Sequence, residues 1–207
     1  MREYSSEKLE ELRADIKNRM SEKRYLHTLG VERAAAKLAA YFCPEAESSL
    51  RAAALLHDIA KEIPCEDQIA FAEAYGILLN KEDLKTKPIL HSFSAPYIIK
   101  RDFPDFAAPE ILSACLNHTV GSPDMSIFDE IIFISDFIED GRAYSSSVEV
   151  RNTLFKELSP LGNEDKVKAL HRALISAINS TLNHLNKLGM QSNSRMILTK
   201  KAFLAKI

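Results

Sequence analysis

The chain has 207 residues, of which 46% are hydrophobic and 27% charged, and its formal net charge is −2. This composition is ordinary for a globular domain, and the charge gives no reason to expect nucleic acid or an anionic membrane as a partner. No apolar run reaches the roughly 18 residues of a membrane span, and the charged N-terminus is unlike a signal peptide. Three widely spaced cysteines without a CxxC pair indicate a reducing compartment, so a cytoplasmic protein is expected.

Apolar residues recur at helical spacing almost throughout the chain, and no segment shows the alternation of a half-buried strand. Ser6 is the candidate N-cap of a first, polar helix, and a second helix is expected over about residues 21–42. Pro44 suits the first position of the next helix. His57 falls on the apolar face of that helix and is therefore expected to point toward the core. Further helices are expected near residues 66–75, 88–101, 108–118, 125–139, 145–158 and 165–188.

These elements predict an all-α protein with one main domain. Residues 1–20 are expected to form an outer N-terminal helix, residues 21–188 the main domain, and residues 189–207 a C-terminal tail. The stretch IIFISDFI is rich enough in β-branched residues for a strand, but its helical surroundings favour a buried helix.

Histidines and aspartates at apolar helical segments are the candidate functional residues. They are His27, His57, Asp58, His91, His118 and Asp136. Imidazole and carboxylate groups bind divalent metals such as iron, manganese, zinc, cobalt or magnesium. A carboxylate buried without a partner is so unfavourable that we expect a cation beside the aspartate of IIFISDFI.

Each of these residues also has an ordinary explanation. A single histidine is more often a hydrogen-bonded core or surface residue, and Asp136 alone could pair with Arg142. We assign no role to His171, His184 or the cysteines. The ordered combination H…HD…H…H…D, with every member on an apolar helical segment, is what favours a metal site.

Four phrases of the sequence resemble the HD-domain metal-dependent phosphohydrolases, and within them the bacterial YqeK family. The phrases are RYLHTLGVERAAAKLA, AALLHDIAKE, LNHTVGSPDMS and IIFISDFIEDGR, between about Arg24 and Arg142. The resemblance implies an all-α HD-domain helical bundle with a central metal site that binds iron. It also implies hydrolysis of diadenosine tetraphosphate, symmetrically, to two ADP.

The resemblance carries over to this chain position by position. It implies His27, His57, Asp58 and Asp136 as metal ligands, with His91 and His118 beside the substrate phosphate and as candidates for a second metal. Asp58, His91 and His118 are the implied catalytic residues. Arg24, Lys61, Thr119 and Arg142 match nucleotide-contacting positions, and Asp58, His91, His118 and Asp136 also face the substrate.

The expected partner is therefore a small dinucleotide, with no nucleic acid and no membrane, and a homodimer is the candidate assembly. A second hypothesis keeps the metal site and changes the substrate to a nucleoside monophosphate or a guanosine pyrophosphate alarmone. A third is a nucleotide-binding regulator without turnover. The basic residues favour a polyphosphate, and the complete ligand set argues against a regulator that has lost its catalysis.

Overall fold

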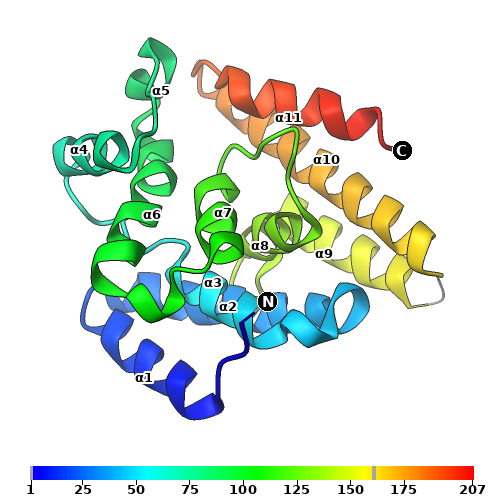
Figure 1. The fold of residues 1–207 in the computed structure, drawn as a ribbon. Helices are drawn as coiled ribbons and strands as arrows, with labels where there is room; N and C mark the ends of the chain where they lie inside the picture. Colours follow the sequence, from blue (N-terminus) through cyan, green and yellow to red (C-terminus); the bar gives the residue numbers. More distant parts are fainter. Residues whose placement is uncertain (1, 160–161) are drawn as a thin grey trace.

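The structure, a computed structural model, describes residues 2–159 and 162–207. Over these two ranges it consists of helices and loops without a β-strand (Figure 1), which confirms the all-α prediction. The α-helices in chain order are α1 (Ser6–Lys17), α2 (Glu22–Phe42), α3 (Glu47–Leu56), α4 (Cys65–Tyr75), α5 (Lys81–Lys85), α6 (Leu90–Asp102), α7 (Pro109–Asn117), α8 (Ile127–Ile138), α9 (Ser145–Leu158), α10 (Asn163–Lys187) and α11 (Ser194–Leu204).

Serine side chains fix where several helices begin. The Ser21 hydroxyl accepts a hydrogen bond from the Arg24 backbone N–H, as expected for an N-cap of α2. The prediction for α1 is wrong by one residue, because Ser5 is the N-cap and Ser6 is already helical. Ser126 and Asp129 form a capping box at the start of α8, which sets the register of that helix.

Helices α2, α3, α7 and α8 pack together at the centre of the fold (Figure 1). The IIFISDFI stretch lies within α8, as predicted, and Ile131, Ile132 and Ile134 are completely buried there. Each such side chain stabilises the fold by about 1.5–3 kcal/mol through loss of apolar contact with water. The same packing carries the polar residues of α8 into the interior.

A second group of helices, α9, α10 and α11, lies along one side of this centre (Figure 1). The sequence predicts no helix after Gly189, yet α11 forms there and packs on α10. Gly189 follows α10 with a φ of +66°, a conformation that favours glycine. Phe203 of α11 is fully buried, and the Thr199 hydroxyl donates to the Val120 carbonyl at 3.1 Å.

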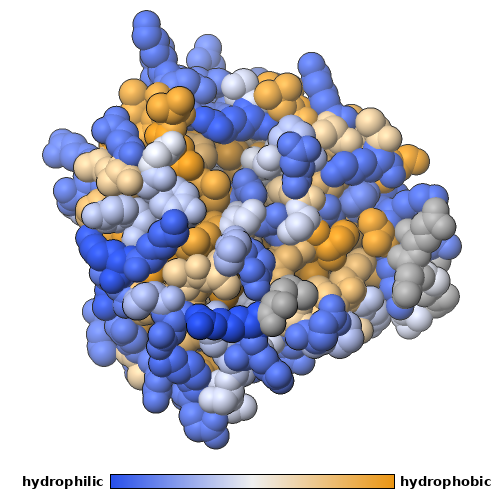
Figure 2. All heavy atoms as spheres, viewed as in Figure 1, coloured by the Kyte–Doolittle hydropathy of each residue, from blue (hydrophilic) through white to orange (hydrophobic). Residues whose placement is uncertain are grey.

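The surface carries mostly hydrophilic side chains, with separate apolar patches on the face that Figure 2 shows. Cys43, Cys65 and Cys115 are free thiols. In the described part of the chain, no helix is both long and apolar enough to cross a membrane.

Candidate metal centre

The fold brings the six predicted histidines and aspartates together where several helices end. His57 directly follows α3 and His118 directly follows α7, so each lies at the C-terminal end of a buried helix. Asp58 comes next in the chain, and Asp136 lies two residues before the end of α8. The other two, His27 of α2 and His91 of α6, face them from the sides.

Four of these residues surround one point. His27 Nε2 lies 3.0 Å from Asp136 Oδ1 and 3.8 Å from Asp58 Oδ2. His57 Nε2 lies 3.5 Å from Asp58 Oδ2 and 3.9 Å from Asp136 Oδ1. His57 is fully buried, and Asp58 is 4% exposed. His27, His57 and Asp58 form the first group of possible ligand atoms, and Asp136 lies beside its two imidazoles.

A second group shares Asp58 with the first. Asp58 Oδ1 lies 3.1 Å from His91 Nε2 and 3.6 Å from His118 Nε2, and the two histidine nitrogens are 2.9 Å apart. Because Asp58 turns one oxygen to each group, its carboxylate lies between two clusters of possible ligands.

Backbone carbonyls orient two of the rings. His57 Nδ1 lies 2.6 Å from the Ala54 carbonyl, and His118 Nδ1 lies 2.7 Å from the Cys115 carbonyl. A carbonyl only accepts, so each Nδ1 carries the proton and each Nε2 turns its lone pair to the cluster. This is the arrangement that metal-binding histidines usually have.

The residues of the first group fit a divalent metal ion. Ligand atoms about 2.1 Å from one ion lie about 3.0–3.4 Å apart at adjacent positions and about 4.2 Å apart at opposite ones. The distances around His27 and His57 all lie between 3.0 and 3.9 Å. Both Nε2 atoms are buried without a hydrogen-bond partner among the described residues. The lone pairs of these two nitrogens face carboxylate oxygens, which also only accept. A cation between them would satisfy both.

The electrostatics of the cluster keep its acids ionised. Burial raises the pKa of Asp58, but its interactions with His57 and with the other histidines outweigh burial and hold that pKa well below its usual value. Burial likewise raises the pKa of Asp136, but the Arg142 guanidinium and His27 bring it well below the usual range. Burial lowers the pKa of His91 to about 4, against the effect of Asp58, so its ring is neutral at pH 7.

Three predicted cations border the cluster. Arg24 Nη1 lies 2.5 Å from Asp58 Oδ2, and Arg142 Nη2 lies 2.5 Å from Asp136 Oδ1. The Nε atoms of both arginines are buried donors without a hydrogen-bond partner in the described chain. Lys61 Nζ lies 3.2 Å from both ring nitrogens of His91, and burial lowers its pKa.

Thr119, the last of the predicted nucleotide-contacting residues, also lies at this cluster. Its hydroxyl is 3.3 Å from His91 Nε2. All ten predicted site residues therefore lie in one connected region of the fold.

Glu139 belongs to the same site, although it is not among the residues predicted from the sequence. It is 4% exposed, and its Oε1 lies 3.2 Å from His27 Nδ1. Its Oε2 accepts a hydrogen bond of 2.6 Å from the Gly141 N–H, and a Cβ at Gly30 would collide with the same oxygen. The sequence signal was available in Gly30, a glycine inside a long helix, where glycine is unfavourable without a packing reason.

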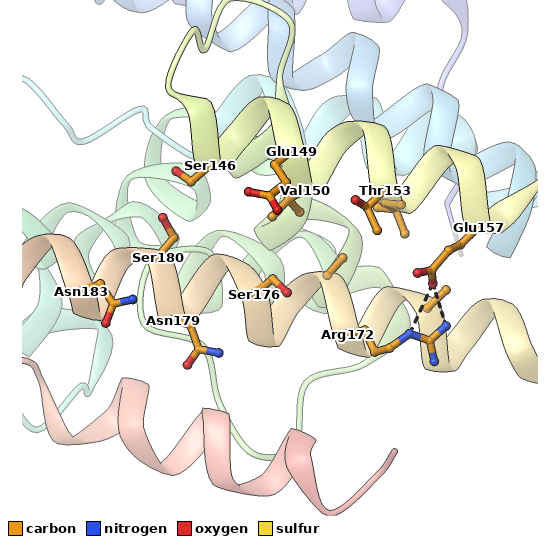
Figure 3. Close-up of a pocket in the computed structure, with 13 residues that line it drawn as sticks. Ser146, Glu149, Val150, Thr153, Glu157, Arg172, Ser176, Asn179, Ser180 and Asn183 are labelled. Carbon is orange, nitrogen blue, oxygen red and sulfur yellow. Dashed lines mark hydrogen bonds and ion pairs between the residues drawn. The ribbon is translucent and has the colours of Figure 1, made fainter.

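A cavity of about 650 Å³ opens beside the cluster, between α8, α9 and the C-terminal part of α10. Its inner wall includes His118, Asp136 and Arg142. A second hollow of about 450 Å³ follows between α9 and α10. Figure 3 shows this second hollow, in which Arg172 and Glu157 form an ion pair of 2.7 Å at one end. No histidine is among the described residues that line it, whereas His118 and Asp136 of the cluster line the first cavity.

Comparison with known proteins agrees with this geometry. The HD domain model matches residues 24–140, the range that contains the six histidines and aspartates of the cluster. The symmetrical bis(5'-nucleosyl)-tetraphosphatase of Bacillus subtilis (strain 168) is 33% identical over 181 residues, which cover 86% of this chain and 88% of the relative. A protein of the same name from Halalkalibacterium halodurans is 28% identical over 146 residues, or 70% of this chain and 75% of the relative.

A solved structure extends the likeness to the whole fold. It is described as a predicted HD superfamily hydrolase involved in NAD metabolism from Clostridium acetobutylicum. The two chains superpose with a TM-score of 0.81 at 28% identity, and the match covers 100% of each. The helical fold and its cluster of histidines and aspartates define an HD-domain protein. The chain belongs to the HD-domain family and, within it, to the family of the symmetrical bis(5'-nucleosyl)-tetraphosphatases.

Proposed function

We propose that this protein is a metal-dependent phosphohydrolase that cleaves diadenosine tetraphosphate symmetrically into two ADP. Membership of the family supports the reaction, since the relatives from Bacillus subtilis and Halalkalibacterium halodurans carry that name at 33% and 28% identity. The chain also has its own support for a polyanionic substrate, because three cations border the cluster of ligand atoms.

The unmet hydrogen-bonding capacity of the site is the observation that carries the proposal. Among the described residues, the lone pairs on His27 and His57 have no donor, and the Nε–H groups of Arg24 and Arg142 have no acceptor. Leaving buried polar groups unsatisfied is costly, so such a site is suited to binding a cation and an anion together. A metal ion with a phosphate group beside it supplies both.

We propose His27, His57, Asp58 and Asp136 as the metal ligands, with His91 and His118 as candidates for a second ion. Such a donor set accepts several divalent metals, and the family resemblance favours iron. When bound, a divalent ion acts as a Lewis acid on phosphoryl oxygens and makes water acidic enough to ionise near neutral pH.

The remaining residues act on the phosphate chain. Arg24 and Arg142 pair with Asp58 and Asp136, and their planar guanidinium groups suit bidentate contacts to phosphate oxygens. Lys61 contributes a further positive charge from the side of His91. This charge offsets the repulsion that a polyphosphate exerts on an incoming nucleophile.

His91, His118 and Thr119 can hydrogen-bond the phosphate next to Asp58. His91 Nε2 lies within 3.3 Å of the Thr119 hydroxyl and within 2.9 Å of His118 Nε2. These three polar atoms therefore converge on one place, where they orient a phosphoryl group for attack.

Turnover of a panel of nucleotides by metal-loaded protein tests the proposal. The panel contains diadenosine tetraphosphate, AMP and a guanosine pyrophosphate alarmone, each with wild type and with Asp58→Ala. We expect the wild type to hydrolyse the dinucleotide best, and the variant to lose metal and turnover while its helical circular dichroism persists. Preference for AMP or the alarmone would contradict the proposed substrate, and an active Asp58→Ala would contradict the metal site.

A further inference from the structure

We propose that the cavity of about 650 Å³ beside Arg142 is a separate subsite for the second nucleoside diphosphate half of the substrate. This inference rests on the proposed function, because it assigns a place to the part of the dinucleotide that leaves as ADP. The subsite is formed by the loop between α8 and α9 and by the polar face of α10.

The cations near the metal cluster fall into two sets. Arg24 and Lys61 lie on the side of Asp58 and His91, and neither lines the cavity. Arg142 lies beside Asp136 and does line it. A chain of four phosphates that crosses the cluster would therefore meet positive charge on both sides. Such a site suits a substrate with two equivalent charged ends.

One face of α10 adds a lysine and a histidine to the cavity. Ser180, Asn183, His184 and Lys187 line it, and their spacing of three and four residues places them on one side of the helix. The side chains of His184 and Lys187 make no ion pair or hydrogen bond with any described residue. Both are exposed and free to reach phosphate oxygens.

The loop opposite α10 is held in place by Arg151. Its guanidinium donates to the backbone carbonyls of Ile138, Glu139 and Arg142. Arg142 and the nearby Tyr144 are therefore presented to the cavity from a fixed backbone. Tyr144 lines the cavity and is 71% exposed, so its ring contributes little to the packing of the protein itself.

An exposed ring at a cationic cavity suits a nucleobase. Bases stack on aromatic side chains without much dependence on sequence, and Phe137 adds apolar wall on the same side. Pockets for small molecules usually have volumes of about 300–1,000 Å³ and combine apolar walls with a few polar groups. A cavity of about 650 Å³ can hold one nucleoside diphosphate, and its polar end adjoins the cluster.

The subsite gives the central cut a structural reason. Hydrolysis adds a water oxygen to one phosphorus and breaks the bridging bond to the next, so negative charge develops on the departing ADP. Arg142, His184 and Lys187 are placed to receive that charge. One nucleoside diphosphate on each side of the cluster puts the central bridge at the metal.

Kinetics with two substrates of equal phosphate number test the base contact. Diadenosine tetraphosphate has the second nucleoside, whereas adenosine 5'-tetraphosphate lacks it. We expect Tyr144→Ala to lower kcat/KM about 10-fold more for the dinucleotide than for the shorter compound, mainly through KM. Tyr144→Phe, which keeps the ring, should restore the wild-type preference. An equal effect of Tyr144→Ala on both substrates would overturn the base contact.

A binding measurement tests the phosphate contacts without turnover. We expect isothermal titration of wild-type protein with ADP to give two sites per chain, and Lys187→Ala to weaken one of them about 10-fold. Lys201→Ala, an exposed lysine of α11 outside the cavity, is the matched control. One ADP per chain in wild type, or equal behaviour of both variants, would overturn the subsite. If wild type binds two ADP but cleaves another nucleotide, the subsite stands and the proposed substrate fails.

Discussion

His27 Nδ1 lies 3.2 Å from Glu139 Oε1, so a buried carboxylate lies directly behind one of the proposed metal ligands. An ionised carboxylate only accepts hydrogen bonds, which assigns the proton to Nδ1 and the lone pair to Nε2. The other two oriented rings, His57 and His118, have neutral backbone carbonyls in this position. Of these three rings, His27 is therefore the one whose electron donation to a metal is strengthened by an anion, Glu139.

Removing this carboxylate should weaken metal binding. Because such outer partners contribute about 10- to 100-fold to metal affinity, we expect about 10-fold weaker binding for Glu139→Gln and about 100-fold for Glu139→Ala. Competition with a chromophoric chelator measures the affinity. Glu73→Gln, an exposed glutamate of α4, is the control. Wild-type affinity in Glu139→Ala would show that the contact does not act on the metal.

Gly30→Ala should disturb the same contact from the opposite side. Alanine favours a helix by about 1 kcal/mol over glycine, but its Cβ would collide with Glu139 Oε2. We expect thermal stability to change little and metal affinity to fall. The double variant with Glu139→Gln should lose less affinity than the two single effects combined, because both act on one contact. Additive losses would mean that Gly30 acts elsewhere.

Arg142→Ala should impair catalysis without removing the metal. The guanidinium pairs with Asp136 but cannot itself be a ligand. Loss of one donor to the transition state typically costs about 10²-fold in kcat, so we expect a loss of that order with unchanged metal content. Arg142→Lys keeps the positive charge but loses the planar guanidinium group, so its kcat should lie between those of wild type and Arg142→Ala. Unchanged kinetics would make Arg142 an ordinary partner of Asp136.

Asp83 should stabilise the C-terminal helix in a pH-dependent way. It is fully buried and accepts hydrogen bonds from Asn193 and Arg195 at the start of α11. Burial raises the pKa of Asp83, but these partners bring it below its usual value. The stabilisation is therefore complete above about pH 4, the unfolded-state pKa, and is lost as the pH falls through the lower folded-state pKa.

Asp83→Asn should accordingly lower the free energy of unfolding by about 1–3 kcal/mol at pH 7. The difference from wild type should shrink as the pH falls from about 4 through the lower folded-state pKa, because Asp83 then becomes neutral like the asparagine. Urea denaturation at a series of pH values measures it, with Asp67→Asn on α4 as an exposed control. A difference that is independent of pH would show that the charge of Asp83 has no part in it.

The centre of the fold was predictable because its signals are local. Apolar spacing places the helices around IIFISDFI, and Ser21 marks the start of α2 within one residue. The six cluster residues could be found for a related reason. Histidines and aspartates on apolar segments are unfavourable unless something binds them, so their chemistry is visible in the sequence itself.

The parts that were missed depend on contacts between distant segments. Helix α11 is held by Asn193 on Asp83 and by Thr199 on Val120, and neither pairing is visible locally. Glu139 follows a helix end, where the sequence suggests only a turn. Only the folded chain brings Glu139 to His27 and turns the polar face of α10 toward the cavity.

Hydrolysis of diadenosine tetraphosphate in oxygen-18 water is the measurement that tests the central claim most directly. Metal-loaded protein is mixed with the dinucleotide, and the first products are separated by chromatography and identified, with their oxygen-18 content, by mass spectrometry. The symmetrical reaction predicts ADP as the sole nucleotide product, with one labelled oxygen for every two ADP formed. ATP and AMP as first products, with the label in either, would contradict the central cut.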